Sequence, residues 1–594
     1  MPALPLYQGT ANDGRDPFDL LPQNALINAK PGAEHLEMMH GIKKLADSFG
    51  KSRGGVFCQT DLIRGEHRVM GKYLVLNENG KLTQLNKHKI PVFEIDARAD
   101  KTAIKVGDTA TMTVKYSQGE GEKQTVFSSG ALPDGVVVTQ TLDTDTEDRF
   151  QVTSSKIGAV KIKFTSSDLN NEIEYEFDFN FQDSDPAEPL PVSLNRKTEA
   201  REEDVFIEGD GFAKLVPTNN NIAITTNREQ YLYNQELGLR KNTAKFIGEP
   251  IDTCFMNERL IDITIDSENK TAYVAQHVAG KDFTIKPLAS GKSDAEPDEI
   301  IGIERNTGNY LYIFNRFTIE IFIDAGGETE TNQYTLRRQQ QSEIQGGLSA
   351  TNLKVNVGGT YCLIGGKKAE PIAFHVIEGG RLRMISNADI NMKLAAYSQA
   401  QLDASWLEYI QLGAHKLIVC QLPDQTIIHD LATGGWATFT SSTGFTPKTP
   451  WRASHVIYNH DYGSHTVGDK SLDVIGKLDK STFQQYEENQ EFIAYTPGYD
   501  FGRRGTRFNS LYLETITGDY DRDYTQRLYI TESIQKLKDF GNEREYEVAN
   551  YLEYDRIFLQ RQLGHRRGKT SFRLRLVGPY RSSIGQALMI NEEP

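Results

Sequence analysis

The sequence predicts an all-β protein built around a β-propeller of about six or seven blades, with an inserted Ig-like β-sandwich and a C-terminal β-domain. Three observations support this prediction. Apolar and polar residues alternate in short runs bounded by turn residues, as in YLYIFNRFTIEIFID from residue 310 to 324. Units of strand, glycine-rich turn and strand recur at intervals of roughly 40 to 50 residues, which is typical of propeller blades. Helical periodicity is scarce, and no alternation of strands with helices indicates a parallel sheet.

A chain of 594 residues is too long for a single hydrophobic core, so we expect several domains. We assign residues 1–50 to an N-terminal docking segment, residues 51–90 and 188–498 to the propeller, and residues 91–187 to the inserted domain. Residues 499–594, where the strands become longer, are expected to form a C-terminal β-sandwich or platform domain.

Seven segments match the strand–turn–strand pattern of a blade in arrangement, although not in residue identity. They span residues 55–85, 220–235, 259–276, 299–322, 359–386, 416–439 and 452–478. The segment DLATGGWATF is the most blade-like, because its Gly-Gly turn leads Trp436 onto the next strand.

The predicted insert differs in composition from the sequence around it. Residues 91–185 carry twice as many acidic as basic side chains, and in NEIEYEFDFNF the acidic residues face one way while Ile173, Tyr175, Phe177 and Phe179 face the other. Six or seven short strands over such a length are typical of an Ig-like sandwich, although the Cys-Trp-Cys pattern of antibody domains is missing. The acidic, proline-rich segment QDSDPAEPLPV is expected to be the exit linker.

One helix is predicted, beginning near Ser398 and running through SQAQLDASWLEYI. Ser398 and Gln401 have the spacing of a capping box, and Leu402, Trp406 and Tyr409 recur at helical intervals.

Composition excludes several classes of protein. No stretch has the length and apolarity of a membrane helix, and the N-terminus has neither the basic start nor the apolar run of a signal peptide, so we expect synthesis in a cytoplasm. A net charge of −15 argues against a general nucleic-acid binder, but it suits a conduit that must not grip DNA. The four cysteines, at positions 58, 254, 362 and 420, stand alone in the sequence and are expected to be buried reduced thiols.

No motif predicts catalysis, a metal site or a cofactor. GTYCLIGGKK lacks the first glycine of a phosphate-binding loop, because Tyr361 occupies that position. The acidic run at Asp143, Asp145, Glu147 and Asp148 could hold calcium, but a solvated hairpin tip is favoured because the loop glycine and terminal glutamate are missing. Isolated histidines, at positions 277, 375, 415 and 429, are interpreted as core or interface residues rather than ligands.

The clearest charge asymmetry lies near the C-terminus, where eight basic residues from Arg556 to Arg581 occur without one acidic residue. Three interpretations are open: pairing with the acidic segment just upstream, contact with another subunit or an adaptor, and contact with passing phosphate. The candidate interface residues are Arg561, Arg566, Arg567, Lys569, Arg573 and Arg575. Arg337 and Arg338, which precede three glutamines, are candidates for a loop that points into a channel.

Five collinear segments resemble the tail nozzle or tail hub proteins of short-tailed bacteriophages, also called packaged-DNA stabilization proteins. The segments are DPFDLLPQNALINAK, DEIIGIERNTGNYLYIFNRFTIEIF, AAYSQAQLDASWLEYIQLGAHKLIVCQLPDQTIIHDL, RASHVIYNHDYGSHTVGDKSLDVIGKLDKSTFQQY and RGKTSFRLRLVG. They extend over nearly the whole chain except the predicted insert, which is a departure from the family.

The resemblance implies a non-enzymatic structural protein of the virion tail, assembled in the host cytoplasm as a ring of six subunits below the portal and the head-to-tail adaptor ring. In that role it would seal the channel over packaged DNA and later conduct the double-stranded genome without sequence-specific binding. Implied partners are the adaptor and portal complex, a tail needle or plug, and tailspike or fibre proteins.

Two alternatives remain at the level of sequence. A propeller could bind or cleave carbohydrate, because the fold supports many functions. The Ig-like insert could serve as an adhesion module that contacts the host cell surface.

Overall fold

The computed structural model describes most of the chain, with gaps. The described residues are 3–5, 26–30, 35–118, 123–128, 132–168, 170–186, 191–226, 228–242, 248–266, 271–279, 285–291, 298–306, 309–324, 336–339, 343–441, 449–496, 499–500, 506–517, 523–533, 540–549, 555–566, 568–580 and 582–592. Strands dominate this part of the chain and only two short helices occur in it, so the all-β prediction is confirmed.

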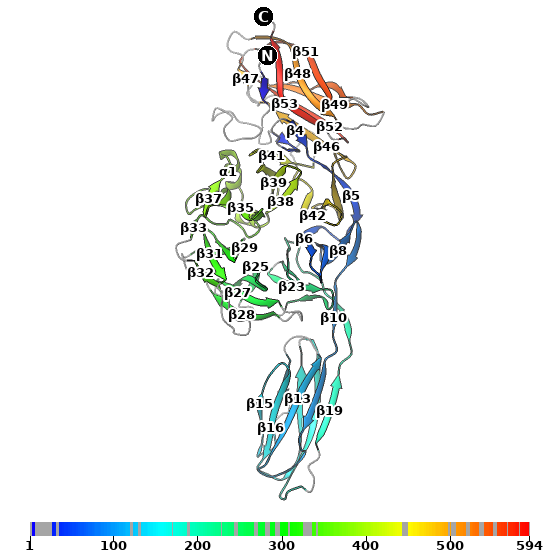
Figure 1. The fold of residues 1–594 in the computed structure, drawn as a ribbon, viewed down its shortest axis with the longest axis vertical. Helices are drawn as coiled ribbons and strands as arrows, with labels where there is room; N and C mark the ends of the chain where they lie inside the picture. The colour runs from blue at the N-terminus through cyan, green and yellow to red at the C-terminus, as the bar shows by residue number, and fades with distance from the viewer. Residues whose placement is uncertain are drawn as a thin grey trace.

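Seven sheets lie around a common centre in the middle of the molecule (Figure 1). In six of them, four strands consecutive in sequence pair antiparallel. The sheets are β6 (Ser52–Gln59), β7 (Arg64–Met70), β8 (Tyr73–Glu78) and β9 (Lys81–Gln84); β21 (Lys214–Pro217), β22 (Ile222–Thr226), β23 (Glu229–Asn234) and β24 (Gly238–Lys241); β25 (Glu249–Met256), β26 (Arg259–Asp266), β27 (Thr271–Ala279) and β28 (Ile285–Gly291); β29 (Ile300–Arg305), β30 (Tyr310–Asn315), β31 (Thr318–Asp324) and β32 (Leu336–Arg338), with β33 (Ile344–Gln345) also on β31; β34 (Lys354–Val357), β35 (Thr360–Gly365), β36 (Ala373–Glu378) and β37 (Arg381–Met384); β38 (Trp406–Leu412), β39 (His415–Gln421), β40 (Thr426–Asp430) and β41 (Trp436–Phe439); and the seventh, β42 (Ala453–Asn459), β43 (Ser464–Asp469) and β44 (Val474–Asp479).

The seventh sheet obtains its fourth strand from the other end of the chain. β5 (Gly41–Asp47) pairs antiparallel with β44, with Ile42 opposite Leu478, and so closes the ring. The sequence assignment had placed this strand in the docking segment 1–50. Its GIKKLAD pattern lacks strict alternation, and only pairing with a strand more than 400 residues away identifies it as part of the propeller.

The C-terminal domain is a β-sandwich that also uses N-terminal strands. One sheet contains β3 (Ala29–Lys30), β4 (His35–Met38), β53 (Ser582–Glu592), β48 (Thr506–Thr517) and β51 (Asp555–Arg566), with β1 (Ala3–Pro5) on β53. The other contains β46 (Glu488–Tyr495), β52 (Lys569–Gly578), β49 (Gln526–Ser533) and β50 (Arg544–Ala549), with β47 (Tyr499–Asp500) on β52. β2 (Leu26–Ile27) and β45 (Gln484–Gln485) pair with β46 and join this sheet to the last two propeller sheets.

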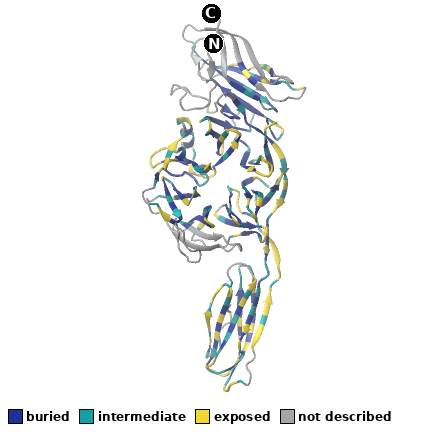
Figure 2. Cartoon of the chain, viewed as in Figure 1, coloured by how far each residue is buried: buried dark blue, intermediate teal, exposed yellow. Residues whose placement is uncertain are grey.

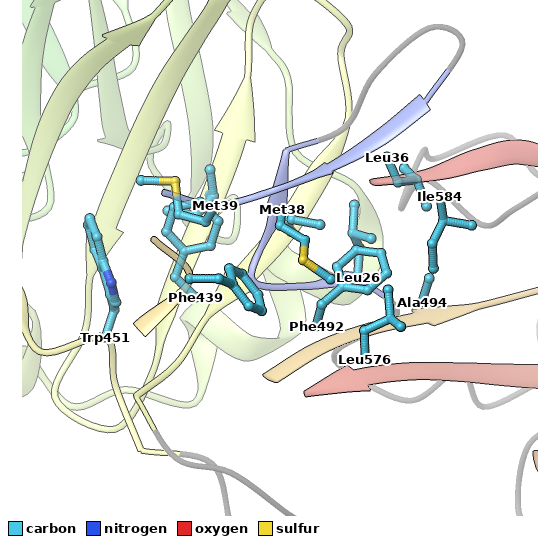
Figure 3. Packing of buried hydrophobic residues seen from close by; sticks show 14 of the residues in the cluster. Leu26, Leu36, Met38, Met39, Phe439, Trp451, Phe492, Ala494, Leu576 and Ile584 are labelled. Atoms are coloured by element: carbon cyan, nitrogen blue, oxygen red, sulfur yellow. The ribbon is translucent and has the colours of Figure 1, made fainter. Parts of the chain in front are cut away.

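One hydrophobic cluster runs from the propeller into the sandwich (Figure 3). Phe439 and Trp451 come from the propeller side, Met38 from the N-terminal strand, and Phe492 and Leu576 from the sandwich, and all five are buried. Because the two units share one core, we expect the sandwich to hold a fixed position on the propeller.

The insert forms its own two-sheet sandwich with its own core. One sheet contains β11 (Glu94–Ala99), β13 (Thr109–Gln118), β15 (Val136–Leu142), β16 (Glu147–Ser154) and β19 (Val192–Lys197), and the other contains β12 (Ala103–Lys105), β14 (Gln124–Phe127), β17 (Gly158–Ser167) and β18 (Glu172–Gln182). Buried hydrophobic residues from both sheets form one core cluster, and Figure 2 shows buried and exposed residues mixed along the strands of the insert. The alternation predicted for β18 is present, with Ile173, Tyr175, Phe177 and Phe179 buried and the intervening residues exposed.

The insert is attached by two antiparallel strands, β10 (Lys87–Ile90) and β20 (Arg201–Asp204), on the side of the propeller away from the C-terminal sandwich (Figure 1). Its last strand, β19, follows the proline-rich segment that was predicted to be the exit linker, so the domain continues past residue 187. The boundary of the domain lies beyond residue 187 because β19 pairs along its whole length with β11.

The predicted helix is much shorter than expected. α2 (Gln399–Asp403) begins with the predicted capping box, but it ends before Trp406, and Trp406 and Tyr409 lie on β38. The residues WLEYIQL also alternate apolar and polar, and pairing with β39 outweighs the helical spacing. A second helix, α1 (Ala388–Ala395), is capped by the side chain of Asn387 and was not predicted.

Candidate functional site

The first strands of the seven sheets meet around the propeller axis, where polar groups connect each sheet to the next. Contacts join the first strands in six neighbouring pairs: β6–β21, β21–β25, β25–β29, β34–β38, β38–β42 and β42–β6. The links, taken in order, are Ala213 N to Arg53 O (2.7 Å), Lys214 Nζ to Asp252 Oδ1 (2.7 Å), Ile303 N to Asp252 Oδ2 (2.8 Å), Thr351 Oγ1 to Ile301 O (2.8 Å), Leu407 N to Asn352 O (2.9 Å), His455 N to a Glu408 carboxylate oxygen (2.9 Å), and Ser52 Oγ to His455 Nδ1 (3.1 Å). The axis is therefore held by directional contacts as well as by apolar packing.

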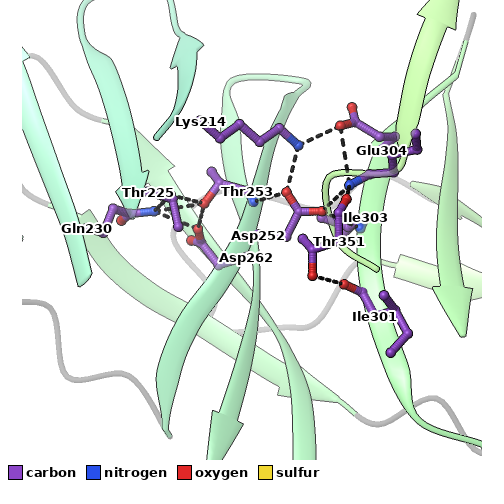
Figure 4. Close-up of polar contacts among 11 residues, drawn as sticks. Lys214, Thr225, Gln230, Asp252, Thr253, Asp262, Ile301, Ile303, Glu304 and Thr351 are labelled. Atoms are coloured by element: carbon purple, nitrogen blue, oxygen red, sulfur yellow. Dashed lines mark hydrogen bonds and ion pairs between the residues drawn. The ribbon is translucent and has the colours of Figure 1, made fainter. Parts of the chain in front are cut away.

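Four of these first strands contribute to one buried charge network (Figure 4). The carboxylate of Asp252, which is 0% exposed, binds the ammonium groups of Lys214 and Lys354, each at 2.7 Å. Lys214 also binds Glu304 at 2.5 Å, and Lys354 lies 3.9 Å from the same carboxylate. Two cations and two anions balance, which is the condition under which buried charges are tolerated.

The pKa values in this network follow from burial and from the neighbouring charges. Burial alone would raise the pKa of Asp252, but the two lysine ammonium groups outweigh it and lower that pKa. Burial alone would lower the pKa of Lys214, but Asp252 and Glu304 outweigh it and raise that pKa. Both groups therefore remain charged at neutral pH.

A second buried carboxylate, that of Asp262, lies beside the network (Figure 4). Asp262 accepts hydrogen bonds from Gln230 Nε2 at 2.7 Å and from the hydroxyl of Thr253. Burial raises the pKa of Asp262 to about 7, although these two hydrogen bonds oppose the shift. This side chain is therefore partly protonated at neutral pH.

A pocket of about 590 Å³ opens at the axis and is lined by residues of the ring. Its walls include Arg53, Lys214 and Thr351 from first strands and from the segments next to them. The volume suits a small molecule. A nucleic-acid duplex is wider than its own major groove, which is about 12 Å across, so a pocket of this volume is too small for it.

Three aromatic rings form one wall of this pocket, here called the aromatic wall: Phe212, Trp406 and His455. Trp406 stacks on His455 with ring centroids 5.1 Å apart and an interplanar angle of 7°, and Phe212 packs against both rings. Burial lowers the pKa of His455 to about 3, so its imidazole is neutral.

The backbone at His455 is unusual, and the buried carboxylate of Glu408 stabilises it. His455 has φ of 51° within a register shift between Ser454 and Ile457, a conformation that is unfavourable for a non-glycine residue. The Glu408 carboxylate accepts the amides of His455 and Val456, both at 2.9 Å, and the indole N–H of Trp406. One carboxylate thus fixes both the bulge and the orientation of Trp406.

Arg53 holds a further part of the pocket lining in place. Its guanidinium donates to the carbonyl oxygens of Gly211, Gly71, Ile207 and Glu208, and to the hydroxyl of Thr226. Burial lowers the pKa of Arg53, opposed chiefly by Asp210. The segment that carries Asp210 and Phe212 is therefore anchored at its base.

The structure gives intramolecular partners to two of the predicted interface residues. Arg575 binds Glu543 at 2.6 Å and Glu491 at 3.3 Å, and Arg573 binds Glu543 at 3.2 Å. Glu543 belongs to the acidic segment upstream, so pairing with this segment accounts for these two arginines. Contact between them and another subunit stays a prediction.

The other members of this group are placed only by their backbone. Arg561 and Arg566 lie on β51, at one edge of its sheet, and Lys569 begins β52. Arg567 lies outside the described residues.

Arg337 and Arg338 lie on β32 rather than in a loop. β32 is the strand of its sheet farthest from the axial strand β29, so the two arginines do not line the propeller axis. Arg338 pairs with Glu320 at 3.4 Å and with Glu343 at 3.3 Å, and Arg337 is exposed. A position in a channel formed between subunits stays a prediction.

The weaker candidates have structural explanations. All four cysteines are buried and free, as predicted. In the acidic run, Asp148 is buried and accepts the backbone amides of Thr125 and Thr144, while Asp143 and Asp145 lie in the hairpin turn. Within the described residues, no group of three or more histidine, cysteine or acidic side chains could hold a metal ion.

The structure describes the side chains of three of the four histidines that the sequence singled out. His415 binds Asp430 at 2.7 Å, His375 Nδ1 lies 3.0 Å from the carbonyl of Ala373, and His429 is buried against Trp436. His277 lies on β27, and its side chain is outside the described part of the chain.

No helix in the described ranges has the length and apolarity to span a membrane.

Sequence analysis missed the charge network and misplaced Trp406. A signal was present, because each of four axial strands carries a charged residue in an otherwise mainly apolar run, as in AKLVP, IDTCF, IGIE and LKVNV. The sequence did not indicate that these positions lie close together, because their proximity depends on the closure of the ring.

Comparisons with known proteins agree with this architecture. Residues 202–483 match the model of a family described as "Bacteriophage P22 Gp10, beta-propeller". The chain is also similar to the tail hub protein gp10 of Salmonella phage P22, with 25% identity over 291 residues, covering 49% of this chain and 60% of that protein. The match thus spans less than two thirds of the relative, and the predicted resemblance to tail hub proteins is confirmed, with the family match lying over residues 202–483.

Solved structures that are similar to this chain include two proteins from Bacteroides thetaiotaomicron. One is a structural genomics protein of unknown function, with 11% identity, a TM-score of 0.28, and coverage of 65% of this chain and 97% of that chain. The other is an auxiliary nutrient binding protein, with 11% identity, a TM-score of 0.29, and coverage of 64% and 97%. Superpositions at this level carry no functional argument.

Proposed function

We propose that this chain is the tail hub, or nozzle, subunit of a short-tailed bacteriophage. It acts as a structural, non-enzymatic part of the virion tail that seals the channel over packaged DNA and later conducts the genome. The observation that carries the proposal is the match of residues 202–483 to the phage family model, because that region contains five complete propeller sheets and three strands of a sixth.

In the proposed assembly, six copies form a ring below the adaptor ring and portal, and the passage for DNA lies between the subunits. The small axial pocket and the charge network support this arrangement, because the propeller axis offers no route for a duplex. A symmetric ring multiplies each moderate contact, so no single strong contact is required.

The C-terminal sandwich is the unit that we propose for docking to the adaptor ring. Its edge strand β51 carries the backbone of Arg556, Arg561 and Arg566, and arginine suits contacts with carboxylates on a partner. The tail needle or plug, tailspikes or fibres, and the transiting double-stranded DNA are the remaining proposed partners.

Virions made without the protein test the sealing function. Particles assembled without this chain should package DNA and then lose it, and supplying the chain from a plasmid should restore retention. Particles that lack the chain and still keep their genome would refute the proposal. The mass of the purified protein, alone and mixed with its adaptor ring, tests the ring of six, since a defined hexamer should form with the adaptor.

A second function, contact with the host surface, is proposed for the insert. It is favoured by the two-strand attachment, which holds a separately folded domain away from the propeller and opposite the sandwich (Figure 1). Virions lacking residues 92–199 should retain DNA but adsorb poorly. Normal adsorption by such virions would exclude an adhesion role.

A further inference from the structure

The aromatic wall presents an apolar surface inside a polar pocket. Of the three tryptophans in the chain, Trp436 and Trp451 are buried, and Trp406 is the one that remains partly exposed. Its ring is held by His455 and Glu408, so it would be presented to a ligand without losing conformational freedom. An aromatic side chain fixed in this way is typical of a binding site rather than of a surface.

Polar groups with unused hydrogen-bonding capacity line the rest of the pocket. Asp210 and Asn352 make no side-chain hydrogen bond to any other part of the chain that the structure describes, and Asp403 accepts one from Gln399 at 2.8 Å. Two carboxylates and an amide supply several acceptors and a donor pair. Such a set pairs well with hydroxyl groups, each of which both donates and accepts.

The charges of the pocket do not favour an anion. Its three cations are occupied: Arg228 binds Glu249 at 3.0 Å, Lys214 binds two carboxylates, and Arg53 donates to four carbonyls and a hydroxyl. The carboxylates of Asp210 and Asp403 add negative charge to the same walls. A ligand that brought a further negative charge would be repelled by both.

We propose that the axial pocket binds one or two pyranose rings of a neutral saccharide. The C–H face of a pyranose would pack on the aromatic wall, and its hydroxyl groups would pair with Asp210, Asn352 and Asp403. A pocket of about 590 Å³ has room for a ligand of this size. This activity is additional to the tail hub role and does not depend on it, and it involves no bond cleavage.

Tryptophan fluorescence of the purified full chain tests the proposal, because a ligand on Trp406 would change the emission of the one partly exposed tryptophan. The probes are the methyl glycosides of glucose, galactose, mannose and rhamnose, with glucuronic acid as the anionic comparison. Saturation-transfer NMR on the same samples gives a second measure of binding. At least one neutral glycoside should bind saturably, and glucuronic acid should bind more weakly.

Pocket variants locate the binding. Asn352→Ala and Asp403→Ala should each weaken binding of the glycoside about tenfold, which is the order expected for one lost hydrogen bond of about 1.4 kcal/mol. The control Glu236→Gln changes an exposed turn carboxylate outside the pocket and should leave affinity unchanged. The proposal is overturned if no neutral glycoside binds by either method, if glucuronic acid binds more tightly, or if both pocket variants bind like the unmodified chain.

Discussion

Replacing Asp252 by Asn should destabilise the propeller by about 3 to 5 kcal/mol. The side chain is fully buried and accepts two ammonium groups at 2.7 Å and the amides of Ile303 and Thr253 at 2.8 and 2.9 Å. Asn keeps the size but removes the charge, which leaves an excess positive charge on Lys214 and Lys354. Removing one partner of a buried ion pair typically costs about 3 to 5 kcal/mol.

Urea unfolding followed by tryptophan fluorescence measures this cost, because Trp406 and Trp436 lie in one propeller sheet and Trp451 lies beside it. Glu378→Gln is the matched control, since it breaks an exposed pair with Arg383 and should leave the urea midpoint almost unchanged. The double variant Asp252→Asn, Lys354→Met should recover part of the loss, because it removes the excess charge. A cost below about 1 kcal/mol for Asp252→Asn would show that the network does not stabilise the ring.

The pH dependence of the same Asp252 variant gives a further check on sign. The pKa of Asp252 is lower in the folded chain than in the unfolded one, so its contribution is present at neutral pH and is lost as pH falls through the folded value. The difference between the variant and the unmodified chain should therefore be largest at neutral pH and decrease in acid. A difference that grows in acid would contradict the charge argument.

Three other predictions concern stability and domain structure. Burial lowers the pKa of His429 to about 4, so below about pH 6.5 the unfolded chain binds a proton that the folded chain excludes. Moving from pH 7 to pH 5 should therefore lower the free energy of unfolding by about 2 kcal/mol through this residue. In the variant His429→Gln, the urea midpoint should decrease less between these two pH values. Gly54→Ala should prevent stable folding, because the added Cβ would lie 1.8 Å from the carbonyl oxygen of Ala213. Gly541→Ala is the control and should be tolerated. Thermal unfolding of the two variants measures the difference. Residues 92–199 should fold alone into a β-sandwich, because their core is separate from the propeller; a random-coil circular dichroism spectrum would contradict this.

The propeller sheets were predictable from sequence because, apart from β5, their strands pair with neighbours that are consecutive along the chain. Alternation in a segment such as 299–322 indicates both the strands and their pairing, so the seven candidate segments correspond to the seven sheets. The predicted alternation of β18 succeeded for the same local reason.

Features that depend on pairing across long distances in sequence could not be predicted. β5 and β4 are short, mixed in pattern and separated by hundreds of residues from β44 and β53. The charge network was not predicted for the same reason, because its four side chains come together only when the ring of sheets closes. Trp406 shows a different limit: its spacing fits a helix and its alternation fits a strand, and tertiary pairing decides between them.

The two ends of the chain complete units that lie far from them in sequence: β5 finishes the last propeller sheet, and β4 lies against β53. During translation, neither unit can be completed until its distant partner strand has left the ribosome, and contacts of such long range form slowly. A prematurely terminated polypeptide would keep bare strand edges, which favour aggregation. Incomplete copies would therefore lack both a closed propeller and a complete C-terminal sandwich.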